Sequence, residues 1–105
     1  MKGFDMGGML RQAQKMQKEM ARLQEDLKKR VVEGTAGGGM VTAQVTGGLE
    51  LVSLKIDPQV LSPDEKDVLE EMIVAAVNAA TQEAQKMAQQ EMGKLTGGMN
   101  LPGIS

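Results

Sequence analysis

The sequence has no cysteine, histidine, tryptophan or tyrosine, and Phe4 is its single aromatic residue. Without cysteine or histidine the chain cannot form a disulfide, a zinc-finger site or a histidine-dependent catalytic triad. The shortage of aromatic rings argues against a surface for single-stranded nucleic acid, because such surfaces stack bases on aromatic side chains. The absence of cysteine is typical of a reducing compartment.

Long apolar runs are also absent. No run approaches the roughly 20 apolar residues that span a bilayer, and the opening residues lack the apolar segment of a signal peptide. We therefore expect a cytoplasmic protein with no membrane contact. A chain of 105 residues predicts a single domain over 1–105, with a flexible lead-in at 1–8 and a flexible tail at 93–105.

Residues 8–30 predict a long helix, because good helix formers fill the segment and no proline interrupts it. Apolar residues alternate at spacings of four and three, which places them along one narrow edge of a helix. These residues, the apolar ridge, are Met9, Ala13, Met16, Met20, Leu23 and Leu27. Such a ridge packs against another helix.

The middle of the chain predicts three strands, at 31–36, 40–46 and 49–56, from their β-branched residues and alternating pattern. Gly37–Gly39 is a flexible link between the first two strands. Gly47–Gly48 predicts a two-residue hairpin turn, because both glycines tolerate positive φ. In the third strand one face carries Val52, Leu54 and Ile56, and the other carries Leu49 and Leu51, so we expect part of that face to be covered too.

A second helix is predicted to begin at Ser62, with Ser62 as N-cap, Pro63 at the first helical position and Glu65 completing a capping box. It continues to about Met92, where Gly93 ends it. Its apolar stripe is rich in alanine, which lets another backbone approach closely: Leu69, Met72, Ile73, Ala76, Val77, Ala80, Ala84 and Met87.

The order helix, three-stranded antiparallel sheet, helix predicts an α+β fold. The helices should measure about 35 and 45 Å, whereas three strands make a sheet about 14 Å wide. The sheet cannot cover both helices, and a short chain buries little surface alone. We therefore predict a homodimer.

Charge is unevenly distributed along the chain. Residues 1–33 hold eight cations and five anions, whereas residues 50–71 hold two cations and seven anions. On the helix face opposite the apolar ridge lie five cations, the basic stripe: Arg11, Lys15, Lys18, Arg22 and Lys29. Such cations bind phosphates with release of counterions and position a protein without reading base sequence.

Lys28, Lys29 and Arg30 form a second basic cluster, although cations also stabilise a helix C-terminus without any ligand. The stripe has an alternative too: an ordinary solvated face on which Glu19, Glu25 and Asp26 form local ion pairs. A different class of function is a protein–protein adaptor, in which the apolar ridge docks onto a repair or replication protein. Asn78 suits either a buried position at a dimer interface or the surface.

No catalytic, cofactor or metal site is predicted. Gly37–Gly39 lacks the lysine and hydroxyl of a phosphate-binding loop and does not lead into a helix. Glu70, Glu71 and the acids near residue 65 could in principle bind a metal, but acids at the start of a helix need no such explanation. No nucleophile–base pair is identifiable, so we do not expect an enzyme.

An ordered set of short segments resembles the YbaB/EbfC family of bacterial nucleoid-associated proteins and covers nearly the whole chain. The segments are 9–17 (Met-Leu-Arg-Gln-Ala-Gln-Lys-Met-Gln), 36–41 (Ala-Gly-Gly-Gly-Met-Val), 56–58 (Ile-Asp-Pro), 75–78 (Ala-Ala-Val-Asn) and 101–103 (Leu-Pro-Gly). The resemblance implies an intertwined homodimer whose long helices project like tweezers. It also implies binding to double-stranded DNA, a location at the nucleoid and an association with recombination-repair genes.

The sequence departs from this family in two places. Ala79 stands where members often carry an acid. The end of the second helix has only Lys86 and Lys94 as cations, offset by Glu83 and Glu91. We therefore expect the first helix to carry nearly all of the DNA contact, with Arg11, Lys15, Lys18, Arg22, Lys28, Lys29 and Arg30 as DNA-binding residues.

Overall fold

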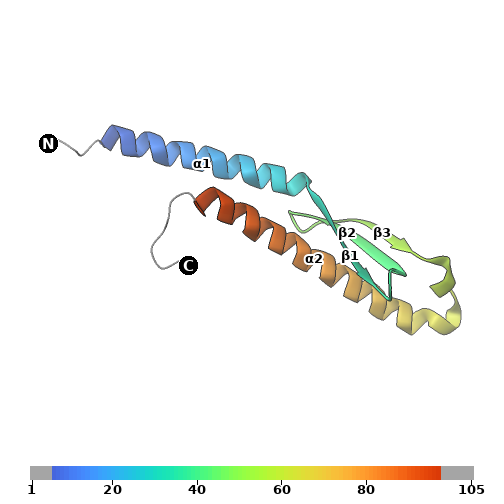
Figure 1. The fold of residues 1–105 in the computed structure, drawn as a ribbon. Helices are drawn as coiled ribbons and strands as arrows, with labels where there is room; N and C mark the ends of the chain where they lie inside the picture. The colour runs from blue at the N-terminus through green and yellow to red at the C-terminus, as the bar shows by residue number, and fades with distance from the viewer. Residues whose placement is uncertain (1–5, 98–105) are drawn as a thin grey trace.

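The computed structural model describes residues 6–97 and confirms the predicted α+β order. Helix α1 (Met6–Lys29) leads into strands β1 (Val31–Ala36), β2 (Val41–Thr46) and β3 (Leu51–Ile56), and helix α2 (Lys66–Gly97) closes the chain. Two 3₁₀ turns, Pro58–Val60 and Pro63–Glu65, join β3 to α2. The molecule is elongated, with extents of 77 × 27 × 15 Å, and α1 projects from one end (Figure 1). Neither helix is apolar enough over its described residues to cross a membrane.

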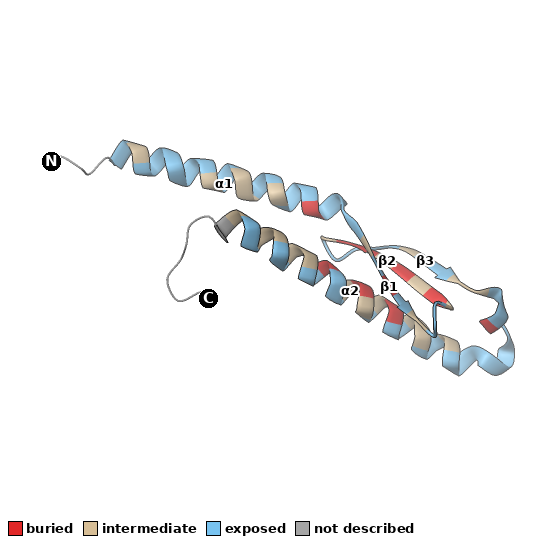
Figure 2. Ribbon diagram, in the orientation of Figure 1, coloured by how far each residue is buried: buried red, intermediate tan, exposed pale blue. Residues whose placement is uncertain are grey.

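The sheet is antiparallel in the order β1-β2-β3, and α2 packs across β1 and β2. Because successive residues of a strand face opposite sides, β2 sends its apolar side chains to the α2 face. The core therefore consists of Val41, Ala43 and Val45 from β2 and Ala76, Ala80 and Ala84 from α2 (Figure 2). This agrees with the alternation and the alanine stripe that the sequence shows.

The alanines of α2 bring its backbone onto β1 at Gly34. A Cβ atom at Gly34 would overlap the Ala80 backbone nitrogen and stand 2.5 Å from the Ala76 carbonyl oxygen. Position 34 has no space for a side chain, so only glycine fits there. This confirms the expected close approach of another backbone to the alanine stripe.

The predicted two-residue turn at Gly47–Gly48 is wrong. The Thr46 N–H donates to the Glu50 carbonyl (2.9 Å) around a three-residue loop, and the positive φ of 65° falls on Leu49. The physical reason is packing, since a Cβ atom at Gly47 would overlap the Leu27 carbonyl. Gly47 thus lets the loop touch the end of α1, and β3 starts at Leu51 rather than at residue 49.

Both ends of α2 also differ from prediction. The Ser62 side chain makes no capping hydrogen bond and precedes a 3₁₀ turn, so the capping box does not form. Gly93 does not end the helix, which runs on to Gly97. Leu95 is half-buried and lines a hollow with Leu23 of α1. Residues 93–97 of the predicted tail are helical; 1–5 and 98–105 lie outside the described residues.

Two apolar surfaces are uncovered in the single chain. Along the ridge, burial decreases from Leu27 (5% exposed) to Met9 (58% exposed), because the N-terminal half of α1 extends past the end of α2 (Figure 2). On the sheet, α2 leaves β3 largely uncovered, and Leu51, Val52 and Leu54 are 46%, 50% and 37% exposed. The expectation that part of the Leu49 face is covered is not met within this chain, since Leu49 and Leu51 are both exposed.

Candidate nucleic-acid interface

The basic stripe lies along one face of α1, opposite the apolar ridge. Helical spacings of four, three, four and seven bring Arg11, Lys15, Lys18, Arg22 and Lys29 onto that face, and all five side chains are exposed. The first four span about 17 Å of helix at 1.5 Å per residue. The structure thus places these five predicted residues together on a protruding element.

Most of the stripe is not neutralised by acids in the described part of the chain. Within residues 6–97, Lys15, Lys18, Arg22 and Lys29 take part in no hydrogen bond or ion pair. Of the acids expected to form local pairs, Glu25 pairs with Lys28 (3.5 Å) and Asp26 with Arg30 (2.7 Å). These acids therefore pair with Lys28 and Arg30 and leave the charges of Lys15, Lys18, Arg22 and Lys29 available to a ligand.

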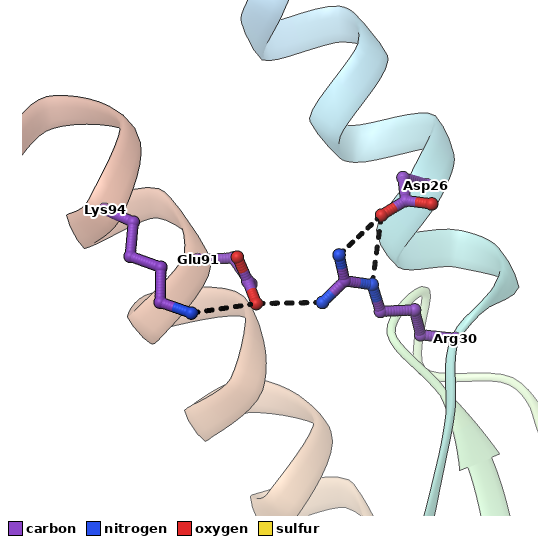
Figure 3. Close-up of polar contacts among 4 residues, drawn as sticks. All are labelled: Asp26, Arg30, Glu91 and Lys94. Atoms are coloured by element: carbon purple, nitrogen blue, oxygen red, sulfur yellow. Dashed lines mark hydrogen bonds and ion pairs between the residues drawn. The ribbon is translucent and has the colours of Figure 1, made fainter.

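The second cluster is divided among different roles. Lys28 is exposed but paired with Glu25, and Lys29 is exposed and belongs to the stripe. Arg30 follows the last residue of α1 and binds two carboxylates (Figure 3). Its Nε and Nη2 donate to Oδ2 of Asp26 at 3.0 and 2.7 Å, and its Nη1 donates to Oε1 of Glu91 at 2.8 Å. The structure does not bring Arg30 onto the face of the stripe as a free cation.

These contacts shift the pKa values of Glu91 and Arg30. The hydrogen bond from Arg30 lowers the pKa of Glu91 below its ordinary value of 4.5, with Lys94 adding a smaller electrostatic effect. In turn the hydrogen bonds to Glu91 and Asp26 raise the pKa of Arg30. Both partners are therefore charged at neutral pH.

Glu91 is a residue whose role the sequence does not reveal. It is separated from Arg30 by 61 positions, so no helical spacing connects the two. Lys94, one of the two cations near the end of α2, lies 3.6 Å from the same Glu91 oxygen. Lys86 is exposed and remains the only unpaired cation over residues 86–97. The α2 end thus contributes little positive charge, consistent with the sequence.

The remaining candidates do not form a site in the described part of the chain. Gly37, Gly38 and Gly39 make a tight turn, all with positive φ. Asn78 is exposed on α2 near Glu70 and Glu71. Over residues 6–97 no group of three or more acidic, cysteine or histidine side chains is arranged to hold a metal ion.

The chain is similar in sequence to a DNA-binding family and to proteins named nucleoid-associated proteins. The YbaB/EbfC DNA-binding family matches residues 1–99. A protein of Pelotomaculum thermopropionicum named a nucleoid-associated protein is 50% identical over 104 residues, covering 99% of both chains. One of the same name from Caldanaerobacter subterraneus subsp. tengcongensis is 48% identical over 102 residues, covering 97% of this chain and 92% of its own.

A solved structure supports the fold. The crystal structure of an uncharacterized protein from Helicobacter pylori superposes with a TM-score of 0.65 at 26% identity, covering 93% of this chain and 99% of that one. The family is one of DNA-binding proteins, which agrees with the expectation that the chain is not an enzyme. From its sequence match along nearly its whole length, the chain belongs to the YbaB/EbfC DNA-binding family.

Proposed function

We propose that this protein binds double-stranded DNA as a homodimer, through phosphate contacts made by the basic stripe of α1, with weak sequence preference. The observation that supports this proposal is the exposed row of Lys15, Lys18 and Arg22, which no acid of the described chain neutralises. The protein would act at the nucleoid in the cytoplasm, in nucleoid organisation, gene regulation or recombination repair. Relatives named nucleoid-associated proteins support the location.

The chemistry of the stripe suits the DNA backbone. Lysine and arginine bind phosphate oxygens, and such contacts carry no base-sequence information. One strand of duplex DNA has a phosphate about every 3.4 Å along the axis, so about 17 Å of helix faces roughly five of them. Nothing aromatic stands on α1 to stack bases, which favours duplex over single-stranded DNA.

A second copy would cover the apolar surface of β3. Leu51, Val52 and Leu54 are exposed on an edge strand, and an uncovered apolar edge is a liability that proteins cover by pairing or packing. Two copies would also double the charge presented to a duplex. The positions of Arg11, Lys15, Lys18 and Arg22 would then supply eight cations.

The test is duplex-DNA binding, measured by fluorescence anisotropy, for wild type and two double variants of equal charge. Lys15→Glu/Lys18→Glu reverses the stripe, whereas Lys66→Glu/Lys86→Glu reverses two exposed cations of α2. We expect the stripe variant to lose binding and the α2 variant to retain most of it. Equal losses would show that only net charge matters and would contradict the proposed interface, and absent wild-type binding would contradict the function.

The adaptor function remains a second candidate because part of the ridge is uncovered. Met9 of the ridge is 58% exposed in the single chain, and the neighbouring Met6 and Leu10, which lie outside the ridge, are 71% and 61% exposed. An adaptor that docks through the ridge would lose its protein partner when Met16 or Met20 becomes polar, and would tolerate charge reversal at Lys15 and Lys18. DNA binding predicts the opposite order of effects, provided that the variants remain dimeric.

A further inference from the structure

We propose that Arg30 is a positioning residue: by joining Asp26 to Glu91 it fixes the direction in which α1, and with it the basic stripe, projects from the body. This inference rests on the proposed function of the stripe. We call the three residues the Asp26–Arg30–Glu91 clasp. Arg30 is the one residue between the end of α1 at Lys29 and the start of β1 at Val31, which is the place where α1 would pivot.

The clasp joins α1 to α2 through charged side chains. Asp26 belongs to α1 and Glu91 to α2, and the guanidinium bonds both at once (Figure 3). The side chain of Arg30 thus makes a direct hydrogen-bonded link from the end of α1 to α2. The backbone of Arg30 is held as well, since its carbonyl accepts from the Gly47 N–H at 3.0 Å. The planar guanidinium suits this double role, which a lysine ammonium would fill less rigidly.

The length of α1 makes its direction important. Arg11 lies 19 positions before Arg30, about 28 Å along the helix, so a pivot of about 10° at Arg30 would move Arg11 by about 5 Å. That displacement exceeds the length of an ion-pair contact. A helix already held in one direction also loses less conformational entropy when it binds DNA, which is the usual benefit of preorganisation.

Glu91→Gln separates positioning from charge. The substitution removes an acid and frees Lys94, so electrostatics alone predicts tighter DNA binding, whereas loss of the clasp predicts weaker binding. Glu83→Gln on the same helix makes the same charge change at an exposed residue with no ion pair. Substitution of Arg30 itself is less informative because it also removes a cation.

Two readouts test the proposal. The chain has no cysteine, so Gln12→Cys and Gln82→Cys place spin labels on exposed positions of α1 and α2. Double electron–electron resonance is measured on labelled chains diluted into unlabelled protein, so that distances within one chain dominate. We expect one narrow distance distribution for wild type and Glu83→Gln, and a broader or displaced one for Glu91→Gln. For duplex DNA we expect Glu91→Gln to bind about two- to fivefold more weakly than Glu83→Gln.

Each alternative outcome contradicts a distinct part of the account. An unchanged distance distribution in Glu91→Gln would overturn the clasp. A changed distribution with DNA affinity equal to or above that of Glu83→Gln would overturn the positioning role. If wild type itself binds no DNA, the proposed function and the positioning role fall together, whatever the distances show. Circular dichroism melting confirms that each variant is folded, and Glu91→Asp, which keeps the carboxylate, should restore part of the affinity.

Discussion

Arg30 and Glu91 are 61 positions apart in the sequence, yet Nη1 of Arg30 donates a hydrogen bond of 2.8 Å to Oε1 of Glu91. The bond ties the end of the first helix to the last third of the second. It also removes Arg30 from the set of cations free to contact phosphates. Among residues 6–97, Lys15, Lys18, Arg22 and Lys29 are then the predicted interface residues without an ion pair.

The ionisation of Glu91 should report the clasp. Because the folded-state pKa of Glu91 is lowered from 4.5 by the Arg30 hydrogen bond, its stabilising effect should be complete above that value and lost as the pH falls through the lowered pKa. Carbon-13 NMR titration of the carboxyl group should give a pKa below 4.5 in wild type and a higher one in Arg30→Met. Identical titration curves for the two proteins would contradict the bond.

Gly34→Ala should destabilise the fold by about 1 to 3 kcal/mol, because the new methyl group would overlap backbone atoms of α2, which cannot move aside as a flexible side chain can. Gly93→Ala is the matched control, since a Cβ atom there meets nothing within 4 Å. Alanine inside an α-helix should raise the free energy of unfolding by about 1 kcal/mol. Urea denaturation measures both, and shifts of the same sign would contradict the packing described.

Leu54→Glu should weaken dimerisation, because it places a charge in the apolar surface of β3 that we assign to the second copy. Leu54 is 37% exposed in the single chain, so the fold itself should tolerate the change. Val74→Glu, at a 60% exposed position of α2, is the control and should leave the dimer intact. Sedimentation equilibrium measures the oligomeric state of each protein. A wild type that sediments as a monomer, or a Leu54→Glu protein that remains a dimer, would contradict the assignment of the β3 surface to the dimer interface.

The sequence was sufficient to predict elements set by local periodicity. The spacing of Met9 through Leu27 identified α1, and the alternation of Val41, Ala43 and Val45 identified β2 with the correct buried face. The basic stripe was predictable for the same reason, since it depends only on the helical repeat. The family resemblance added the DNA ligand, and the family match confirms that class.

Features that depend on contacts between distant segments were not predictable. Gly47 is glycine because the end of α1 touches it, and the local pattern suggested a tight turn instead. The local pattern predicts a helix end at Gly93, whereas α2 runs on to Gly97, where Leu95 lines a hollow with Leu23 of the other helix. Adjacency in the sequence groups Arg30 with Lys28 and Lys29, and gives no sign of its partner Glu91, which lies on another helix.

The most direct test of the central claim is the salt dependence of duplex-DNA binding by wild type and by Lys15→Ala/Lys18→Ala. Affinity falls with salt according to the number of phosphates neutralised, with a slope of about −0.9 per contact. If both arms of a dimer grip one duplex, the variant loses four contacts and its slope should be shallower by about 3 to 4. Parallel slopes for the two proteins would show that these lysines touch no phosphate, and would contradict the account.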